Sequence, residues 1–286
     1  MTRSKPLQQL DLAYADQSPA QKLDLYLPDG EPPSAGWPTV IYIHGGGWAW
    51  GDKADERLST PLSWRARGWA VAALNYRLTG EAGFPAQIFD VKAAVRLLRA
   101  NAARWQLDPA RFAAWGCSAG GHLAALLGAS NDVSVLEDLG QGCPDASSAV
   151  QAVVDFYGPT QLDLMDTYLR QTGLGRADHL EPGSPESRLL GGVPTDRPGE
   201  VIAANPETWV TRLCPPFMLI HAAGDPIVPV QHSVLLAQRI TLMAGASRVR
   251  LLLVEQAGHA TPEFDAPALL DQVADFLDQS LPARSD

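Results

Sequence analysis

Short apolar runs recur along the chain and alternate with longer segments of helical period. Residues 39–43 (TVIYI) and 70–74 (AVAAL) are almost continuously apolar, as in strands covered on both faces. Residues 10–14 and 22–27 instead alternate apolar and polar positions across a short polar turn, which predicts an antiparallel hairpin at a sheet edge. The alternation of strands with helices predicts the α/β class, with a largely parallel sheet wrapped by helices.

Eight strands are predicted in all, at residues 10–14, 22–27, 39–43, 70–74, 111–115, 150–156, 217–221 and 249–254. Apolar positions from Ile88 to Trp105 step by three and four, which predicts an amphipathic helix. Its basic side chains Lys92, Arg96 and Arg99 are expected to face water. Further helices are expected after the fifth strand, before the eighth strand and near the end of the chain.

Residues 158–205 interrupt this rhythm. The segment is rich in Pro and Gly, yet apolar positions over residues 162–169 indicate a helix. Irregular segments longer than ~15 residues inside compact domains are usually functional lids or disordered, and the apolar content favours a lid. We therefore expect a single domain over residues 1–286, with residues 158–205 forming a small cap over one end of the sheet.

Composition narrows the classes of partner. The 286 residues are 46% hydrophobic and 19% charged, which is typical of a globular protein. The net charge of −10 provides no basic field for nucleic acid or an anionic membrane surface. No apolar run reaches the ~18 residues of a membrane span, and no apolar leader segment is evident, so we expect a cytoplasmic protein. Three cysteines without CxxC spacing and histidines without HExxH spacing predict neither disulfides nor a metal site.

A candidate nucleophile lies in the sequence GCSAGG at residues 116–121. This segment follows a predicted strand and opens a predicted helix, which is the context that the G-x-S-x-G pattern requires. Such a turn lifts the hydroxyl of Ser118 above the sheet edge, and glycines at 116 and 120 avoid collisions with neighbouring backbone. Cys117 occupies the variable position and is expected to point away. By itself the pattern also fits an ordinary glycine-rich turn.

A second glycine-rich segment, HGGGW at residues 44–48, follows the strand at 39–43. Consecutive glycines allow backbone N–H groups to point into a cavity, as stabilisation of an oxyanion requires. The candidate donors are the N–H groups of Gly46, Gly47 and Ala119. The alternative is a flexible turn, but two matched motifs at the ends of central strands favour the oxyanion hole.

A serine nucleophile needs a base and a group that orients it. Asp225 follows the strand at 217–221 and His259 follows the strand at 249–254. Ligand sites of parallel sheets gather at the carboxyl ends of their strands, and the order Ser118, Asp225, His259 is that of an α/β-hydrolase. An ordinary turn carboxylate and a loop imidazole are the alternatives. Their joint placement favours a catalytic triad.

Taken together, several stretches resemble the α/β-hydrolase superfamily. Within it they resemble bacterial esterases related to hormone-sensitive lipase and to the feruloyl-esterase-like (BD-FAE type) group. The stretches are HGGGW at 44, NYRL at 75, WGCSAGGHLAALLG at 115, YGP at 157, SPESRLLGG at 184, GDPIVPV at 224 and GH at 258. Relatives of hormone-sensitive lipase usually carry Asp where Cys117 stands and an N-terminal helical cap, for which this chain leaves no room. The feruloyl-esterase-like group is therefore favoured.

The resemblance implies hydrolysis of a small-molecule carboxylic ester, with a short-chain, acetyl or aromatic acyl group and no cofactor. We expect Trp48 and Trp50 to wall the substrate pocket, closed from the insertion by Leu164, Met165 and Tyr168. An arylformamidase or amidase, or an acyltransferase, would use the same triad and stays an alternative. A non-catalytic ligand-binding homologue is disfavoured because the base is present. A homodimer through an exposed sheet edge stays open.

Overall fold

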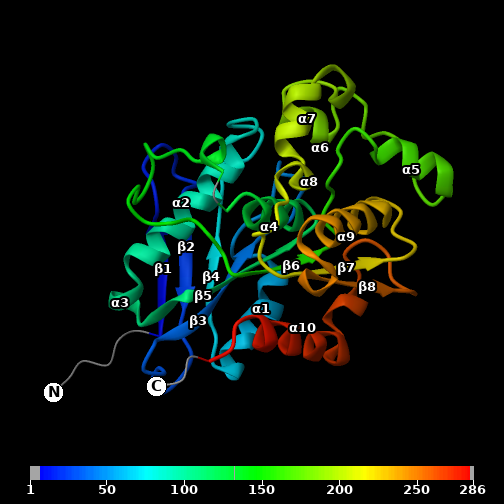
Figure 1. The fold of residues 1–286 in the computed structure, drawn as a ribbon. Helices are drawn as coiled ribbons and strands as arrows, with labels where there is room; N and C mark the ends of the chain where they lie inside the picture. The colour runs from blue at the N-terminus through cyan, green and yellow to red at the C-terminus, as the bar shows by residue number, and fades with distance from the viewer. Residues whose placement is uncertain (1–6, 132, 284–286) are drawn as a thin grey trace.

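The computed structural model describes residues 7–131 and 133–283 and contains one twisted eight-stranded sheet (Figure 1). The strand order is β1-β2-β4-β3-β5-β6-β7-β8. The strands are β1 (Gln8–Ala13), β2 (Lys22–Tyr26), β3 (Trp37–Ile43), β4 (Ala70–Leu74), β5 (Leu107–Cys117), β6 (Ala152–Phe156), β7 (Phe217–Ala222) and β8 (Val249–Val254). The first two strands form an antiparallel edge, and the strands from β4 to β8 are parallel. The predicted eight-stranded, mostly parallel sheet with its edge hairpin is confirmed.

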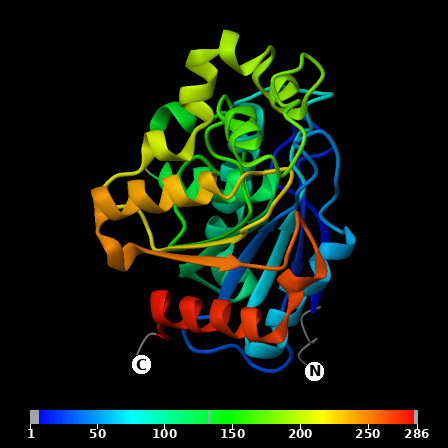
Figure 2. The ribbon, with the colours of Figure 1, turned by 90° about the vertical axis from the view of Figure 1, so that its right-hand side faces the viewer.

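Helices cover both faces of the sheet (Figures 1 and 2). One face carries α2, α3, α4 and α9, and the opposite face carries α1 and α10. The α-helices are α1 (Ser59–Leu62), α2 (Ala86–Ala100), α3 (Ala102–Trp105), α4 (Ala119–Ala129), α5 (Met165–Thr172), α6 (Pro185–Leu190), α7 (Pro198–Ala204), α8 (Pro206–Trp209), α9 (Gln231–Ala244) and α10 (Pro267–Ser280). None of those in the two described ranges combines the length and apolar composition that crossing a membrane requires.

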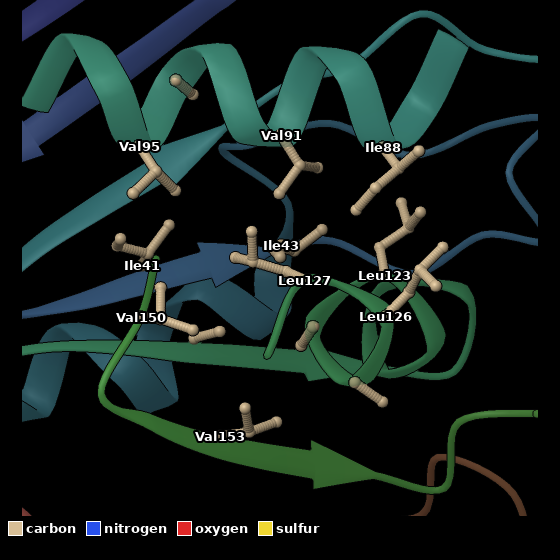
Figure 3. Close-up of a cluster of buried hydrophobic side chains, with 14 of the residues drawn as sticks. Ile41, Ile43, Ile88, Val91, Val95, Leu123, Leu126, Leu127, Val150 and Val153 are labelled. Atoms are coloured by element: carbon tan, nitrogen blue, oxygen red, sulfur yellow. The ribbon is translucent and has the colours of Figure 1, made fainter. Parts of the chain in front are cut away.

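The central strands bury side chains on both faces, as their continuous apolar runs predict. Along β3, Ile41 and Ile43 pack into the core beneath α2 and α4, whereas Val40 and Tyr42 pack into the core beneath α10. This alternation follows from the two-residue period of a strand. Figure 3 shows the first of these cores, where apolar side chains of β3, α2 and α4 meet. Because helices cover both faces of the sheet, the loops at the ends of the strands are held in fixed positions.

The basic side chains of α2 differ from the prediction. Lys92 and Arg96 are 0% and 1% exposed, so the expectation that they face water is wrong. The connection between α4 and β6 covers this side of the helix and supplies Glu137, which pairs with both cations. Lys92 Nζ lies 3.2 Å from Glu137 Oε1, and Arg96 pairs with Glu137 Oε2. Arg99 is half-buried and donates to backbone carbonyls of the same connection.

Residues 158–205 contain α5, α6 and α7 and form the upper part of the molecule in Figure 1. The predicted helix over 162–169 begins in the structure at Met165. A single domain over residues 1–286, with this segment as its cap, stays a prediction. Residues 1–6, 132 and 284–286 of that span lie outside the described part of the chain.

The buried ion pairs of α2 generate a stability prediction. Glu137→Ala leaves two buried cations without their shared carboxylate, so the free energy of unfolding should fall by about 3–5 kcal/mol in urea denaturation. The control Asp271→Ala breaks the exposed pair with Arg67 and should cost less than about 1 kcal/mol. Equal losses in the two variants would contradict a stabilising role for the buried cluster.

Candidate active site

Three strand ends bring the sequence-predicted trio together. Ser118 follows β5, Asp225 follows β7 and His259 follows β8. Ser118 Oγ lies 3.0 Å from His259 Nε2, and His259 Nδ1 lies 2.8 Å from Asp225 Oδ2. These distances form a continuous hydrogen-bonded chain from the hydroxyl to the carboxylate. The three side chains are separated by up to 141 positions in the sequence.

The turn at Ser118 is strained and tightly held. Its φ of 55° lies in the left-handed region, which side chains other than glycine seldom adopt. Its N–H donates to the carbonyl of Phe156 at 2.9 Å, which extends the pairing of β5 with β6 into the turn. Two residues on, a Cβ at Gly120 would collide with the carbonyl oxygen of Ile43. The close approach of α4 to β3 therefore requires glycine here and fixes the hydroxyl at the sheet edge.

Asp225 is held so that one carboxylate oxygen faces the imidazole. Its Oδ1 accepts hydrogen bonds from the N–H groups of Ile227 at 2.8 Å and Val228 at 2.9 Å. Burial alone would raise the pKa of Asp225, but hydrogen bonds from His259 and from the backbone outweigh it and hold that pKa below its usual range. An ionised carboxylate only accepts, so we infer that Nδ1 of His259 carries the hydrogen. Its Nε2 is then free to accept the proton of Ser118.

The cavity at Ser118 is lined by residues whose backbone N–H groups have no partner in the described part of the chain. Gly46 has a φ of 104°, and its carbonyl accepts from the N–H groups of Ala49 and Trp50, which closes a tight turn after β3. Within the described residues, the N–H groups of Gly46 and Gly47 donate to no other protein group. Ala119 opens α4, where N–H groups have no partner within the helix. The three residues of the predicted oxyanion hole therefore line the same cavity as Ser118.

The cavity has a volume of about 480 Å³, and some of the predicted substrate-binding residues line it. Trp48, Trp50 and Met165 line it, as expected. Leu164 and Tyr168 are not among the described residues that line it, so a part for these two in substrate binding stays a prediction. Met165 is buried on the inner side of α5, whereas the Tyr168 ring turns toward the imidazole of His232 at 5.8 Å. Helical periodicity identified an apolar stripe but not which part of it reaches the cavity.

Other side chains at the site were missed by the motif analysis. The edge of the Tyr157 ring packs against His259, with centroids 4.8 Å apart, and Arg57 donates to the carbonyl of Ala260. The YGP stretch at 157 was the available signal for the tyrosine. Cys117 is also among the lining residues, although it is buried and belongs to the core beneath α10. Burial raises the pKa of its thiol to about 12, so it stays protonated and is a poor nucleophile.

A buried carboxyl group lies beside the start of α4, close to the turn at Ser118. Asp155 of β6 is fully buried, and its Oδ1 accepts from the N–H of Gly158 at 2.9 Å. It lies beside Gly121 of α4, where a Cβ would collide with Oδ1. Burial raises the pKa of Asp155 to about 7 despite that hydrogen bond. Among the described residues, no group of three or more His, Cys, Asp or Glu side chains is arranged to hold a metal ion.

The raised pKa of Asp155 predicts a pH-dependent stability. Because its pKa is higher in the folded than in the unfolded chain, the stability that protonated Asp155 contributes should be lost as pH rises from about 4 to about 7. Asp155→Asn keeps the Oδ1 acceptor and removes the titration. The free energy of unfolding of the variant, relative to that of wild type, should rise by roughly 1.4 kcal/mol per pH unit in that window. Above the window the difference should level off. The exposed control Asp145→Asn should show no such trend, and a flat difference for Asp155→Asn would refute the assignment.

The chain is similar in sequence to known proteins. Over 248 residues the chain is 33% identical to the esterase LipC of Mycobacterium tuberculosis, covering 86% of this chain and 58% of LipC. The chain spans less than two thirds of the length of the curated relatives it matches.

Two solved structures are similar over almost the whole chain. A truncated carbohydrate esterase from gut microbiota has a TM-score of 0.85 and 29% identity, covering 96% of each chain. A bifunctional GH43-CE protein of Bacteroides eggerthii also has a TM-score of 0.85, with 31% identity over 98% of this chain and 36% of that chain. The BD-FAE family model matches residues 23–240. The chain therefore belongs to the BD-FAE family and has the α/β-hydrolase fold.

Proposed function

We propose that this protein hydrolyses carboxylic esters through an acyl-enzyme formed on Ser118. The observation that carries the proposal is the hydrogen-bonded chain from Ser118 through His259 to Asp225, which opens on a cavity. An alcohol at its ordinary pKa is a weak nucleophile, and an adjacent oriented base activates it by taking its proton. The names of the relatives, an esterase and a carbohydrate esterase, support the same class of reaction.

In the first step, His259 Nε2 takes the proton of Ser118 as Oγ attacks the ester carbonyl. The N–H groups of Gly46, Gly47 and Ala119 then donate to the oxyanion, where preset dipoles stabilise developing charge better than mobile water does. The imidazolium returns its proton to the departing alcohol. Water repeats the sequence on the acyl-enzyme and releases the carboxylic acid.

The cavity supports small substrates. Its volume of about 480 Å³ lies in the usual range for small-molecule sites. Trp48 is buried in its wall, and Trp50 is 56% exposed, so that one aromatic surface remains open to solvent. These features suit the short-chain, acetyl or aromatic acyl esters that the sequence analysis favours.

Removal of the proposed nucleophile is the direct test. In Ser118→Ala, kcat for p-nitrophenyl acetate should fall by about 10⁴- to 10⁶-fold because no acyl-enzyme can form. Mass spectrometry after treatment with a p-nitrophenyl phosphonate should find the adduct on wild type and not on the variant. The control Ser59→Ala changes an exposed serine and should match wild type in both assays. Near-normal turnover by a folded Ser118→Ala protein would end this assignment.

A further inference from the structure

The cap side of the cavity carries an acidic side chain with no part in the proposed acyl transfer. Glu186, near the start of α6, lines the cavity and is 3% exposed. Its Oε2 is buried and has no hydrogen-bond partner among the described residues. Buried polar atoms are almost always paired, so an unpaired one in a cavity wall points to a group that enters from the cavity. A substrate is the entering group that a cavity beside Ser118 admits.

A second acceptor lies in the same wall. Asp166 accepts both the backbone N–H of His179 at 2.9 Å and a contact from its Nδ1 at 3.2 Å. Because a carboxylate only accepts, Nδ1 of His179 carries a hydrogen, and in the neutral form of the ring Nε2 is then an acceptor. The structure shows no donor to this Nε2 among the described residues, and the His179 side chain lines the cavity. Glu186 and His179 thus line one cavity, and each has an acceptor atom without a donor among the described residues.

This wall lies close to the proposed oxyanion hole. Pro185 packs on the glycine-rich loop after β3, and a Cβ at Gly47 would lie 3.1 Å from Pro185 Cβ. The first turn of α6 therefore rests on one of the proposed donors. Glu186, the next residue, is brought into the same cavity as the reacting carbonyl.

A purely structural role for Glu186 makes a different prediction. Ser184 caps α6 by accepting from the N–H of Ser187 at 3.1 Å, and the Glu186 carboxyl interacts with the Ser184 hydroxyl. Capping by the Ser184 hydroxyl would affect stability without regard to substrate. It leaves Oε2 without a function, so capping alone does not explain the buried, unpaired oxygen.

We propose that Glu186 and His179 bind a hydroxyl group of the substrate, so that the preferred esters carry a free hydroxyl on their acyl or alcohol part. This inference rests on the proposed ester hydrolysis and adds the chemistry by which substrates are selected. A site built to bind a hydroxyl rejects the analogue that lacks it, because its own polar groups are then left unpaired.

The surroundings favour a hydroxyl over an ammonium group. Burial raises the pKa of Glu186 above its usual range, which disfavours the full charge that would hold a cation. A hydroxyl can donate to the carboxylate and can accept from the carboxylic acid, so it fits either form. Arg57 lines the same cavity together with the acidic Asp55 and Glu56, so the charges of the wall do not choose between the two groups, and the comparison with acetylcholine below does.

The test uses pairs of esters that differ in their hydroxyl groups. Glycerol monoacetate is compared with propyl acetate for the alcohol part, and methyl 3-hydroxybutanoate with methyl 3-methylbutanoate for the acyl part. In Glu186→Met, the kcat/KM ratio of hydroxylated to plain ester should fall by about 10- to 100-fold in at least one pair. Glu186→Gln keeps one acceptor and should fall less. The pair affected tells which part of the ester carries the hydroxyl.

The control Glu181→Gln alters an exposed glutamate of the same segment and should leave both ratios at the wild-type value. Equal losses on both members of each pair, or unchanged ratios in folded variants, would overturn the proposal. So would a larger effect of Glu186→Gln on acetylcholine, relative to 3,3-dimethylbutyl acetate, than on the hydroxylated esters. If Glu186→Met does not fold, Glu186→Gln decides the question. Failure of wild type to hydrolyse any of these esters would refute the proposed function itself.

Discussion

Parallel pairing in the centre of the sheet positions every group of the candidate site. In β3, β5, β6, β7 and β8 the chain runs in one direction, so the loop after each strand emerges at the same edge. The register pairs Ile43 with Gly116 and Cys117 with Phe156, so the glycine-rich loop and the turn at Ser118 begin at the same level. The loops at residues 225 and 259 follow β7 and β8 at this edge. The hydrogen-bonded chain from hydroxyl to carboxylate is a consequence of this arrangement.

The packed core allows the edge to hold backbone conformations that would be unfavourable elsewhere. Ser118, Tyr157 and Ala260 all have positive φ, and each directly follows or lies close to a strand end. Hydrogen bonds to neighbouring strands restrain two of them, because the N–H of Ser118 donates to Phe156 and that of Tyr157 donates to Ile220. Strained residues persist where the surrounding structure over-determines them. The strain therefore lies where the proposed chemistry needs a fixed hydroxyl and a fixed imidazole.

Residues 158–205 contribute part of the cavity wall and none of the proposed reacting groups. The glycine-rich loop, the serine turn and the acid and base loops offer one set of reacting groups, which a wide range of esters could use. Selection among esters must come from the remaining walls of the cavity, to which this segment contributes Met165, His179 and Glu186 and the loop after β3 contributes Trp48 and Trp50. Two of the three residues from this segment are polar and buried, which is costly unless a partner is supplied. The cap segment is thus where we locate the choice of substrate.

The sequence by itself determined the sheet and located the three residues of the proposed triad. Continuous apolar runs located the central strands, with 70–74 placed at its observed bounds, because strands covered on both faces need unbroken apolar composition. The edge strand at 249–254 was also placed at its observed bounds. Glycine spacing and strand ends identified Ser118, Asp225 and His259, because chemistry at such an edge requires particular residue types in a particular local context.

Only the tertiary structure decided what covers each surface. Lys92 has the pattern of a solvent-facing residue, and its burial against Glu137 depends on a connection some forty positions away. The same applies to the cavity wall, which includes Met165 and Glu186 and not Tyr168. Periodicity reports the face of an element on which a residue lies. It carries no information about which distant segment packs on that face, because that is set by the sum of long-range contacts.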